Sequence, residues 1–235
     1  MRTDHARGKL IVLEGAEGVG KSTQVGLLLE ALSAAGVPAV TFREPGGTDM
    51  GDVIRSLLLD PRSKLGAAAE ALLFMASRAE LCEREIRPAL TRGAIVVLDR
   101  FFLSTYAYQI AGRGLPENEV RAANALATGG LVPDLTLLLD LPGTSGLDRA
   151  SSRGDTDRME QSAGDFHARV VDAFRVYATG EWSALHQECG SIVRIDGSGP
   201  SDTVFARIVD ELATRLPDVF GVLRATPAGT DRGKR

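Results

Sequence analysis

The chain has 235 residues, of which 44% are hydrophobic and 25% are charged, and its formal net charge is −4. This composition is typical of a globular α/β domain with a sizeable core, and it excludes a disordered, collagen-like or coiled-coil chain. Two cysteines lie far apart, so we expect two free thiols in a reducing compartment. The acidic balance disfavours a nucleic-acid partner. No stretch approaches the ~20 apolar residues of a membrane span, so we expect no membrane partner and a cytoplasmic location.

Short apolar runs alternate with longer helical stretches along the chain. In chain order, the pattern predicts a strand at Leu10–Leu13, a helix at Lys21–Ala35, a strand at Pro38–Arg43, helices at Met50–Leu59 and Ala67–Leu90 (with a break near Pro88), a strand at Ala94–Leu98, helices at Ser104–Ala111 and Glu117–Ala127, a strand at Leu135–Asp140, helices at Thr144–Ser152 and Asp165–His186 (interrupted near Gly180), a strand at Ser191–Ile195 and a helix at Asp202–Leu216.

The five predicted strands are largely apolar runs that are separated by helices. This pattern predicts a doubly wound α/β fold, in which helices cover both faces of a five-stranded parallel sheet. No internal repeat or linker is visible, so residues 1–217 are expected to form one domain. Residues 218–235 are expected to be a mobile tail, because Arg224–Arg235 is rich in Gly, Pro, Thr and basic residues. The alternative for this tail is a basic arm that touches a partner.

A glycine-rich segment matches the phosphate-loop pattern GxxxxGK[ST] in full, directly after the first strand and before a helix. Backbone N–H groups of such a loop point at phosphate oxygens. Lys21 is expected to reach the β- and γ-phosphates of ATP, and the Ser22 hydroxyl to bind Mg²⁺. The residues expected to hold ATP here are Gly15, Ala16, Glu17, Gly18, Val19, Gly20, Lys21, Ser22 and Thr23.

A phosphate loop alone does not distinguish a kinase from a GTPase. One feature favours a GTPase, because Asp140-Leu141-Pro142-Gly143 follows a strand and matches DxxG. It lies late in the chain for that role, and neither asparagine, Asn118 or Asn124, stands in an NKxD guanine-reading motif. We therefore interpret Asp140 as the end of a strand that turns into a helix.

Five further motifs occur in a characteristic order: Phe42-Arg43-Glu44-Pro45-Gly46-Gly47-Thr48, Phe74-Met75-Ala76-Ser77-Arg78, Asp99-Arg100-Phe101, Ser104-Thr105-Tyr106-Ala107-Tyr108-Gln109, and the segment from Arg149 to Glu160. Together with the phosphate loop they resemble bacterial thymidylate kinase, from about Lys9 to about Leu216. The resemblance implies transfer of the γ-phosphoryl group of ATP to dTMP with Mg²⁺, giving dTDP and ADP on the route to dTTP. It also implies a homodimer, a nucleoside-monophosphate-kinase fold and a mobile lid at about residues 149–160.

The acceptor pocket is expected between two helices. Phe74 and Arg78 are four residues apart and share a helix face, and the resemblance implies that Phe74 stacks on thymine while Arg78 contacts the base. It also implies that a second helix lines the base and sugar pocket, through Ser104, Thr105, Tyr108 and Gln109. Tyr108 near C2′ of the sugar is expected to disfavour ribose by crowding a 2′-hydroxyl.

Charged residues follow two of the predicted strands, where ligands of open α/β sheets bind. Asp99 is placed to act through Mg²⁺ or its waters, and Arg100 to clamp a phosphate. Glu44 is expected to hold waters of Mg²⁺ or the acceptor end of the site, and Arg55 to reach the acceptor phosphate. The alternatives are a solvated loop carboxylate for Glu44 and a solvated helix face for Arg55.

None of the variable positions in the phosphate loop is basic. The resemblance then implies the class whose lid supplies the catalytic arginines. Arg153 is expected to be the main transition-state arginine and Arg158 the second, while Arg149 is expected to contact ATP. The alternative is a charged, solvated loop.

Two other functions remain open from the sequence. One is a kinase with a different acceptor, such as another nucleoside monophosphate or a deoxynucleoside. The other is a non-catalytic, regulatory nucleotide-binding protein, which is expected to have lost Lys21, Asp99 or the lid arginines. The Ala- and Leu-rich helix at Ala67–Leu81 is a candidate for part of a dimer interface.

Overall fold

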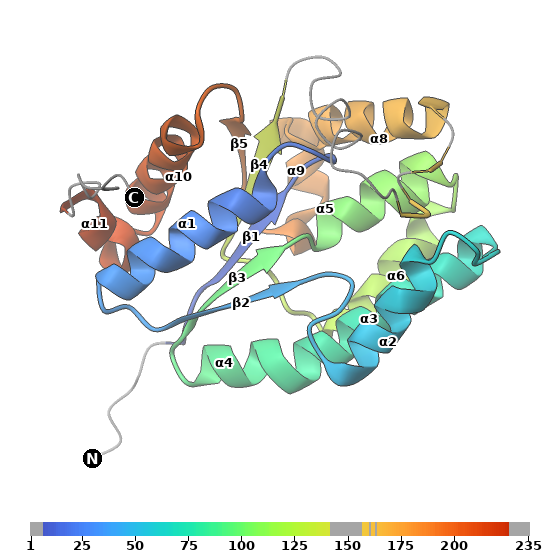
Figure 1. Ribbon diagram of the computed structural model, residues 1–235, viewed down its shortest axis with the longest axis horizontal. Coiled ribbons are helices and arrows are strands. Elements are labelled where there is room, and N and C mark those ends of the chain that lie inside the picture. The colour runs from blue at the N-terminus through green and yellow to red at the C-terminus, as the bar shows by residue number, and fades with distance from the viewer. Residues whose placement is uncertain (1–6, 142–156, 160, 163, 226–235) are drawn as a thin grey trace, which may run out of the picture.

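The computed structural model describes residues 7–141, 157–159, 161–162 and 164–225. Their centre is a five-stranded, all-parallel sheet in the order β2-β3-β1-β4-β5 (Figure 1). The strands are β1 (Leu10–Glu14), β2 (Ala39–Arg43), β3 (Ile95–Asp99), β4 (Leu135–Asp140) and β5 (Ile192–Asp196). The doubly wound parallel sheet expected from the sequence is confirmed.

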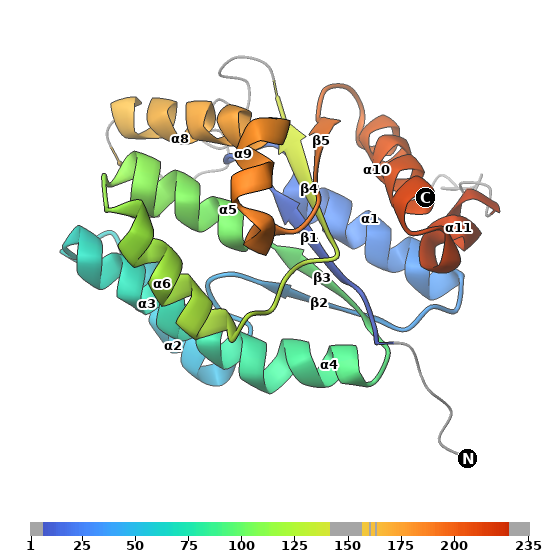
Figure 2. The same cartoon turned by 180° about the vertical axis from the view of Figure 1, so that it is seen from behind.

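Helices cover both faces of the sheet, and this explains why the central strands β1, β3 and β4 are apolar at almost every position before their charged last residues (Figures 1 and 2). Ile11 and Leu13 of β1 face a core shared with α1 (Lys21–Ala34) and α10 (Ser201–Arg215). Leu10 and Val12 face the opposite core, on the side of the sheet where the other helices before β5 lie (Figure 2). Those helices are α2 (Asp49–Leu59), α3 (Ala67–Leu81), α4 (Arg87–Thr91), α5 (Phe102–Thr105), α6 (Glu117–Thr128), α8 (Gly164–Tyr177) and α9 (Gly180–Leu185), with the π-helical segments η1 (Cys82–Ile86) and η2 (Tyr106–Gly112) and the 3₁₀ turn η3 (Gln187–Cys189).

Two long helices expected from the sequence are not regular along their whole length. The chain is helical without a gap from Ala67 to Thr91, but its hydrogen bonding changes from α to π at η1, just before Pro88, which lacks an N–H group and near which a break was expected. The second stretch is interrupted at residues 178–179, directly before the Gly180 at which an interruption was expected. The Thr179 side chain accepts a hydrogen bond from the Trp182 N–H and so caps the start of α9.

The C-terminal boundary expected from the sequence is wrong in part. Residues Pro217–Ala225 form helix α11, where a mobile tail beginning at residue 218 was expected. Phe220 and Leu223 lie one helical turn apart and are buried in the core shared with α1 and α10. Arg224 also hydrogen-bonds Asp210 of α10. The expectations for residues 226–235 and for a helix at Thr144–Ser152 lie outside the described residues.

Each strand ends in a charged residue: Glu14, Arg43, Asp99, Asp140 and Asp196. Because the strands are parallel and in register, these ends meet along one edge of the sheet. The loop between β1 and α1 leaves from the same edge. A ligand site is therefore expected there. None of the described helices is both long and apolar enough to cross a membrane.

Candidate active site

The phosphate loop connects β1 to α1 and has a conformation that requires glycine. Gly15 has φ +138°, and a Cβ added there would lie 2.4 Å from the carbonyl oxygen of Leu139 in β4. Gly20 precedes α1 with φ +96°. The Lys21 side chain folds back over the loop, where its Nζ donates hydrogen bonds to the carbonyl oxygens of Gly15 (2.9 Å) and Ala16 (2.8 Å). The ammonium group is thus held at the centre of the loop.

Lys21 lies in an environment that lacks a sufficient counter-charge. Burial, helped by Arg100, lowers the pKa of Lys21 from 10.5 to about 7, although Asp99, Glu14 and Glu17 oppose this shift. A phosphate group at this position supplies the missing negative charge. The electrostatics of the loop therefore favour an anionic ligand.

Ser22 and Asp99 lie side by side at the carboxyl end of β3. The Ser22 hydroxyl donates a 2.8 Å hydrogen bond to Asp99 Oδ2. A hydroxyl and a carboxylate are oxygen ligands that suit Mg²⁺. The described residues contain no cluster of three or more His, Cys, Asp or Glu that could hold a metal ion. These two residues fit a magnesium ion that takes its other ligands from phosphates and water.

Arg100 is the one non-glycine residue of the described chain with a left-handed backbone, at φ +74°. Its N–H bonds the Leu13 carbonyl oxygen, and its guanidinium donates to the carbonyl oxygen of Gly15 (3.3 Å) and to Ser104 Oγ (3.1 Å). The same group lies over the Tyr108 ring, 5.1 Å from its centroid. This unusual backbone directs a cation to the junction between the phosphate loop and the acceptor side.

Glu17 projects from the phosphate loop toward the acceptor side. The Tyr108 hydroxyl donates a 2.8 Å hydrogen bond to Glu17 Oε1, Arg100 lies 3.8 Å away and His167 lies 3.5 Å away. Burial acts to raise the pKa of Glu17, but His167, Arg100 and Tyr108 outweigh it and lower the pKa from 4.5 to about 2. The sequence predicted Glu17 among the ATP residues, whereas the structure brings its carboxylate to a residue expected to bind dTMP.

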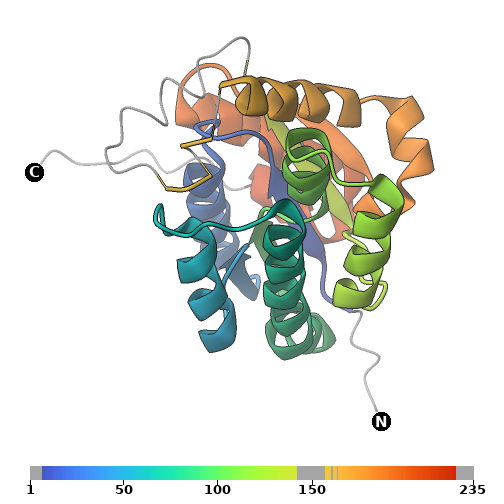
Figure 3. The same ribbon diagram turned by 90° about the vertical axis from the view of Figure 1, so that its right-hand side faces the viewer.

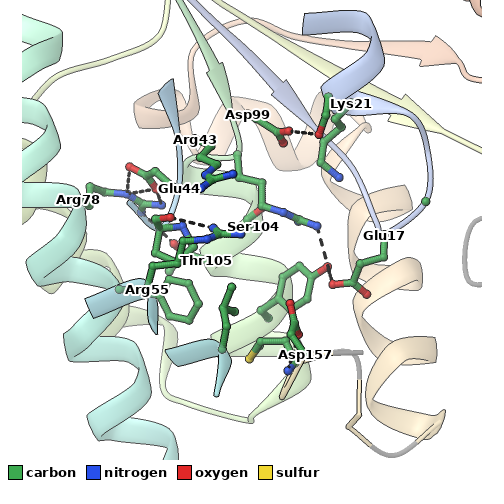
Figure 4. A pocket seen from close by; sticks show the side chains of 18 of the residues that line it. Glu17, Lys21, Arg43, Glu44, Arg55, Arg78, Asp99, Ser104, Thr105 and Asp157 are labelled. Atoms are coloured by element: carbon green, nitrogen blue, oxygen red, sulfur yellow. Dashed lines mark hydrogen bonds and ion pairs between the residues drawn. The ribbon is translucent and has the colours of Figure 1, made fainter. Parts of the chain in front are cut away.

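A cavity of about 310 Å³ runs from the phosphate loop to α3 and η2, a volume in the range of small-molecule sites (Figure 4). The predicted site residues that line it are Glu17, Gly18, Gly20, Lys21, Ser22, Thr23, Glu44, Arg55, Phe74, Arg78, Asp99, Arg100, Ser104, Thr105, Tyr108 and Gln109. Gly15, Ala16, Val19 and Arg158 do not line it, and Arg149 and Arg153 lie outside the described residues.

Five cationic side chains line the cavity: Lys21, Arg43, Arg55, Arg78 and Arg100. Arg55 Nη1 donates to the carbonyl oxygen of Pro45 at 2.8 Å, which fixes its direction. Burial lowers the pKa of Arg55, and the nearby positive charge of Arg43 lowers it further. Mutual repulsion of this kind is relieved when an anion binds between the cations.

Arg78 is buried at the far end of the cavity, and each of its five N–H groups faces a protein acceptor. The Glu44 carboxylate accepts from Nε and Nη2, and the Phe101 carbonyl oxygen accepts from Nη2 at 2.8 Å. Nη1 donates to Thr105 Oγ1 at 2.8 Å and to Asn124 Oδ1. Burial acts to lower the pKa of Arg78, but the Glu44 carboxylate outweighs it and raises the pKa. In this arrangement Arg78 fixes Glu44 and Thr105 and has no N–H group left for a base.

Arg158 points away from the phosphate loop. Its Nε donates to the Leu58 carbonyl oxygen at 2.7 Å, and Nη2 pairs with Glu70 at 2.8 Å. The structure therefore does not bring Arg158 together with Lys21 and Arg100, the residues with which it was predicted to act.

Sequence reasoning missed five residues that line the cavity: Arg43, Pro45, Leu59, Asp157 and Met159. Arg43 could have been found from the sequence, because it is the last residue of a predicted strand and Asp99 directly follows another. Asn124 on α6, which holds Arg78, had no signal in the sequence.

The parallel sheet, the phosphate loop with its Ser22–Asp99 pair and the adjoining cation-lined cavity define a P-loop phosphotransferase. Residues 13–188 match the family model described as thymidylate kinase. The chain is 48% identical over 209 residues to the thymidylate kinase of Synechococcus sp. (strain JA-2-3B'a(2-13)), which covers 88% of this chain and 95% of that protein. It is 44% identical over 218 residues to the thymidylate kinase of Chlorobium chlorochromatii, with the same coverage, and 44% identical over 203 residues to that of Deinococcus radiodurans, covering 86% and 95%. The chain belongs to the thymidylate kinase family and is therefore a kinase.

Proposed function

We propose that this chain transfers the γ-phosphoryl group of ATP to dTMP, giving dTDP and ADP. The observation that carries the proposal is one continuous cavity. Its one end is the phosphate loop, its other end is the wall formed by α3 and η2, and its cations lie between them. A donor nucleotide at the loop and an acceptor phosphate among the cations then face each other.

The reaction needs positioning and charge neutralisation more than covalent help from the protein. An oxygen of the dTMP phosphate forms the new bond to the γ-phosphorus, and the bond from the γ-phosphorus to the β–γ bridging oxygen breaks, so that ADP leaves. Lys21 holds the donor phosphates, while Arg55 and Arg100 orient the acceptor phosphate and offset its charge. Ser22 and Asp99 would hold Mg²⁺, which neutralises charge on the β- and γ-phosphates when bound.

The base and sugar of dTMP occupy the end of the cavity lined by α3 and η2. Phe74 on α3 offers an aromatic face for thymine, and Thr105 and Gln109 offer polar groups beside it. Tyr108 lines the same cavity, and its hydroxyl is held by Glu17, which supports a role for this ring beside the sugar. Arg78 contributes by holding Glu44 and Thr105 in place, and a direct contact of Arg78 with the base requires it to exchange one of these partners.

The roles of Arg153 as the main transition-state arginine and of Arg149 as an ATP contact remain proposals from the resemblance. Loss of the charge in Arg153→Met is expected to lower kcat by about 10³-fold, the lower end of the range for an arginine that stabilises the transferring phosphoryl group. A normal kcat contradicts the assignment.

We also propose that the chain forms a homodimer through the flank made by α2, α3 and α6. These helices lie side by side (Figure 3), and they expose large apolar side chains: Met50, Val53, Leu57, Leu72 and Leu126. Large apolar side chains exposed on neighbouring helices favour an interaction surface. Leu72→Asp is expected to shift the mass measured by light scattering from dimer to monomer, while Leu185→Asp, at an exposed leucine on α9, leaves it unchanged.

We also propose that the protein is located in the cytoplasm. This location is supported by Cys82 and Cys189, which are both free and buried.

The test of the function is a coupled assay of ADP release with ATP and Mg²⁺, comparing dTMP, dUMP, UMP, dCMP and thymidine. Preferential turnover of dTMP is expected. Preferential turnover of another acceptor keeps the phosphate chemistry and contradicts the assignment of the base pocket. ADP release that no acceptor stimulates contradicts the proposed reaction and favours a regulatory role.

A further inference from the structure

Glu70 on α3 is a buried carboxylate that does not line the cavity and yet holds much of its wall. Its side chain is 1% exposed. Oε1 accepts hydrogen bonds from Gln109 Nε2 and Arg113 Nε, both at 3.1 Å. Oε2 accepts from Arg113 Nη2 at 3.1 Å and pairs with Arg158 Nη2 at 2.8 Å. One carboxylate thus joins α3 to η2 and to the segment 157–159.

The groups that Glu70 joins are next to residues that line the cavity. Gln109 lines it directly, and Asp157 and Met159 line it on either side of Arg158. Arg158 also bonds the end of α2, through its N–H to the Leu59 carbonyl oxygen at 3.1 Å. Without the Glu70 carboxylate, this corner of the acceptor wall loses its common point of attachment.

The charges make this attachment depend on Glu70 in particular. Arg113 and Arg158 are like charges that meet at one carboxylate, so its removal leaves two partly buried cations facing each other. Arg113 also lies over the Phe166 ring, 4.3 Å from its centroid, which limits how far it can withdraw. Arg158 is therefore the partner that is expected to move.

We propose that Glu70 is a positioning residue for dTMP, which fixes the acceptor wall by holding Gln109 and Arg158 against α3. The proposal rests on the function proposed above. Among the described residues, Glu70 and the partners named above make no hydrogen bond or ion pair with the phosphate loop. The effect of Glu70 is therefore expected to fall on the acceptor and not on ATP.

The first experiment is steady-state kinetics of Glu70→Gln, which keeps the size of the side chain and removes its charge. The KM for dTMP is expected to rise about tenfold, equivalent to about 1.4 kcal/mol of binding free energy. The KM for ATP is expected to change less than about twofold. Arg158→Gln keeps the Glu70–Arg113 pair and the fold, and it is expected to raise the KM for dTMP to a similar extent.

The double variant Glu70→Gln/Arg158→Gln separates positioning from general damage. If the two residues act through one contact, the double variant raises the KM for dTMP no more than about tenfold, where independent effects give about a hundredfold. The matched control is Glu211→Gln, which removes the 2.9 Å pair with Arg215 on α10, on the other face of the sheet. It is expected to leave both KM values unchanged.

Any one of the following results overturns the proposal: an unchanged KM for dTMP in Arg158→Gln, an equal rise in both KM values in either single variant, or multiplicative effects in the double variant. A lower melting temperature in Glu70→Gln with an unchanged KM for dTMP also overturns it, because the residue is then only structural. If the unsubstituted protein does not turn over dTMP, the proposed function has failed, and this is seen before any variant is measured.

Discussion

Glu17 provides a prediction whose size follows from the structure. Its pKa is held near 2, against 4.5 for an ordinary glutamate, by His167, Arg100 and Tyr108 acting against burial. A group whose pKa is lower in the folded state stabilises the fold at pH values above its unfolded pKa. This stabilisation is therefore complete above about pH 4.5 and is lost as the pH falls toward 2. The difference of about 2.5 pH units corresponds to at most about 3 kcal/mol at 1.36 kcal/mol per unit.

The variant Glu17→Gln tests this reasoning. Its free energy of unfolding, measured by urea denaturation, is expected to fall below that of the unsubstituted protein at pH 7. The gap is expected to close by up to about 2.4 kcal/mol between pH 5 and pH 2.5. Tyr108→Phe removes one hydrogen bond to the carboxylate and keeps His167 and Arg100, so its gap is expected to close by less. Parallel pH curves for Glu17→Gln and the unsubstituted protein would refute the argument.

Three further predictions concern the loop, the cations and the sugar. Gly15→Ala is expected to destabilise the fold by about 2–4 kcal/mol in urea, because its Cβ meets a carbonyl of β4 at a left-handed backbone position. Gly26→Ala, with open space around it in α1, is expected to stabilise by about 0.5–1 kcal/mol, and equal effects would contradict the contact argument. Arg55→Met is expected to raise the KM for dTMP at least about tenfold. The control is Arg62→Met, at an arginine that is 88% exposed, which is expected to leave this KM unchanged. Equal KM values for dTMP in the two variants would show that Arg55 does not bind the acceptor phosphate. Tyr108→Ala is expected to reduce the preference for dTMP over UMP, and an unchanged ratio of kcat/KM values would show that this ring does not select the sugar.

The features that sequence reasoning predicted correctly are those encoded by neighbouring residues. The strands are runs of apolar residues, and the phosphate loop is a contiguous motif between a strand and a helix. Asp99 and Arg100 come directly after a predicted strand. A parallel sheet is therefore enough to bring them to the edge at which β1 ends with Glu14. Helix α11 was not predicted, although Phe220 and Leu223 have the spacing of one helical turn. The composition of the residues that follow favoured a mobile tail for the whole C-terminal segment.

The features that sequence reasoning could not predict depend on side chains that are distant in the chain. Arg78 and Asn124 are 46 residues apart, and only packing of α3 against α6 shows that the guanidinium is saturated. Glu17 and Tyr108 are 91 residues apart, so the direction of the Glu17 side chain was not visible in the loop motif. The partners of such groups decide whether an arginine is free to bind a ligand or serves to hold the wall.

The measurement that tests the central claim most directly is the formation of dTDP from ATP and dTMP by the purified chain, followed by ³¹P NMR, with thymidine as the matched acceptor. The cations between the loop and the acceptor wall predict that dTMP is phosphorylated and that thymidine, which lacks the phosphate they bind, is not. Phosphorylation of thymidine at a comparable rate, or no dTDP with Mg²⁺ and ATP in excess, would contradict the account.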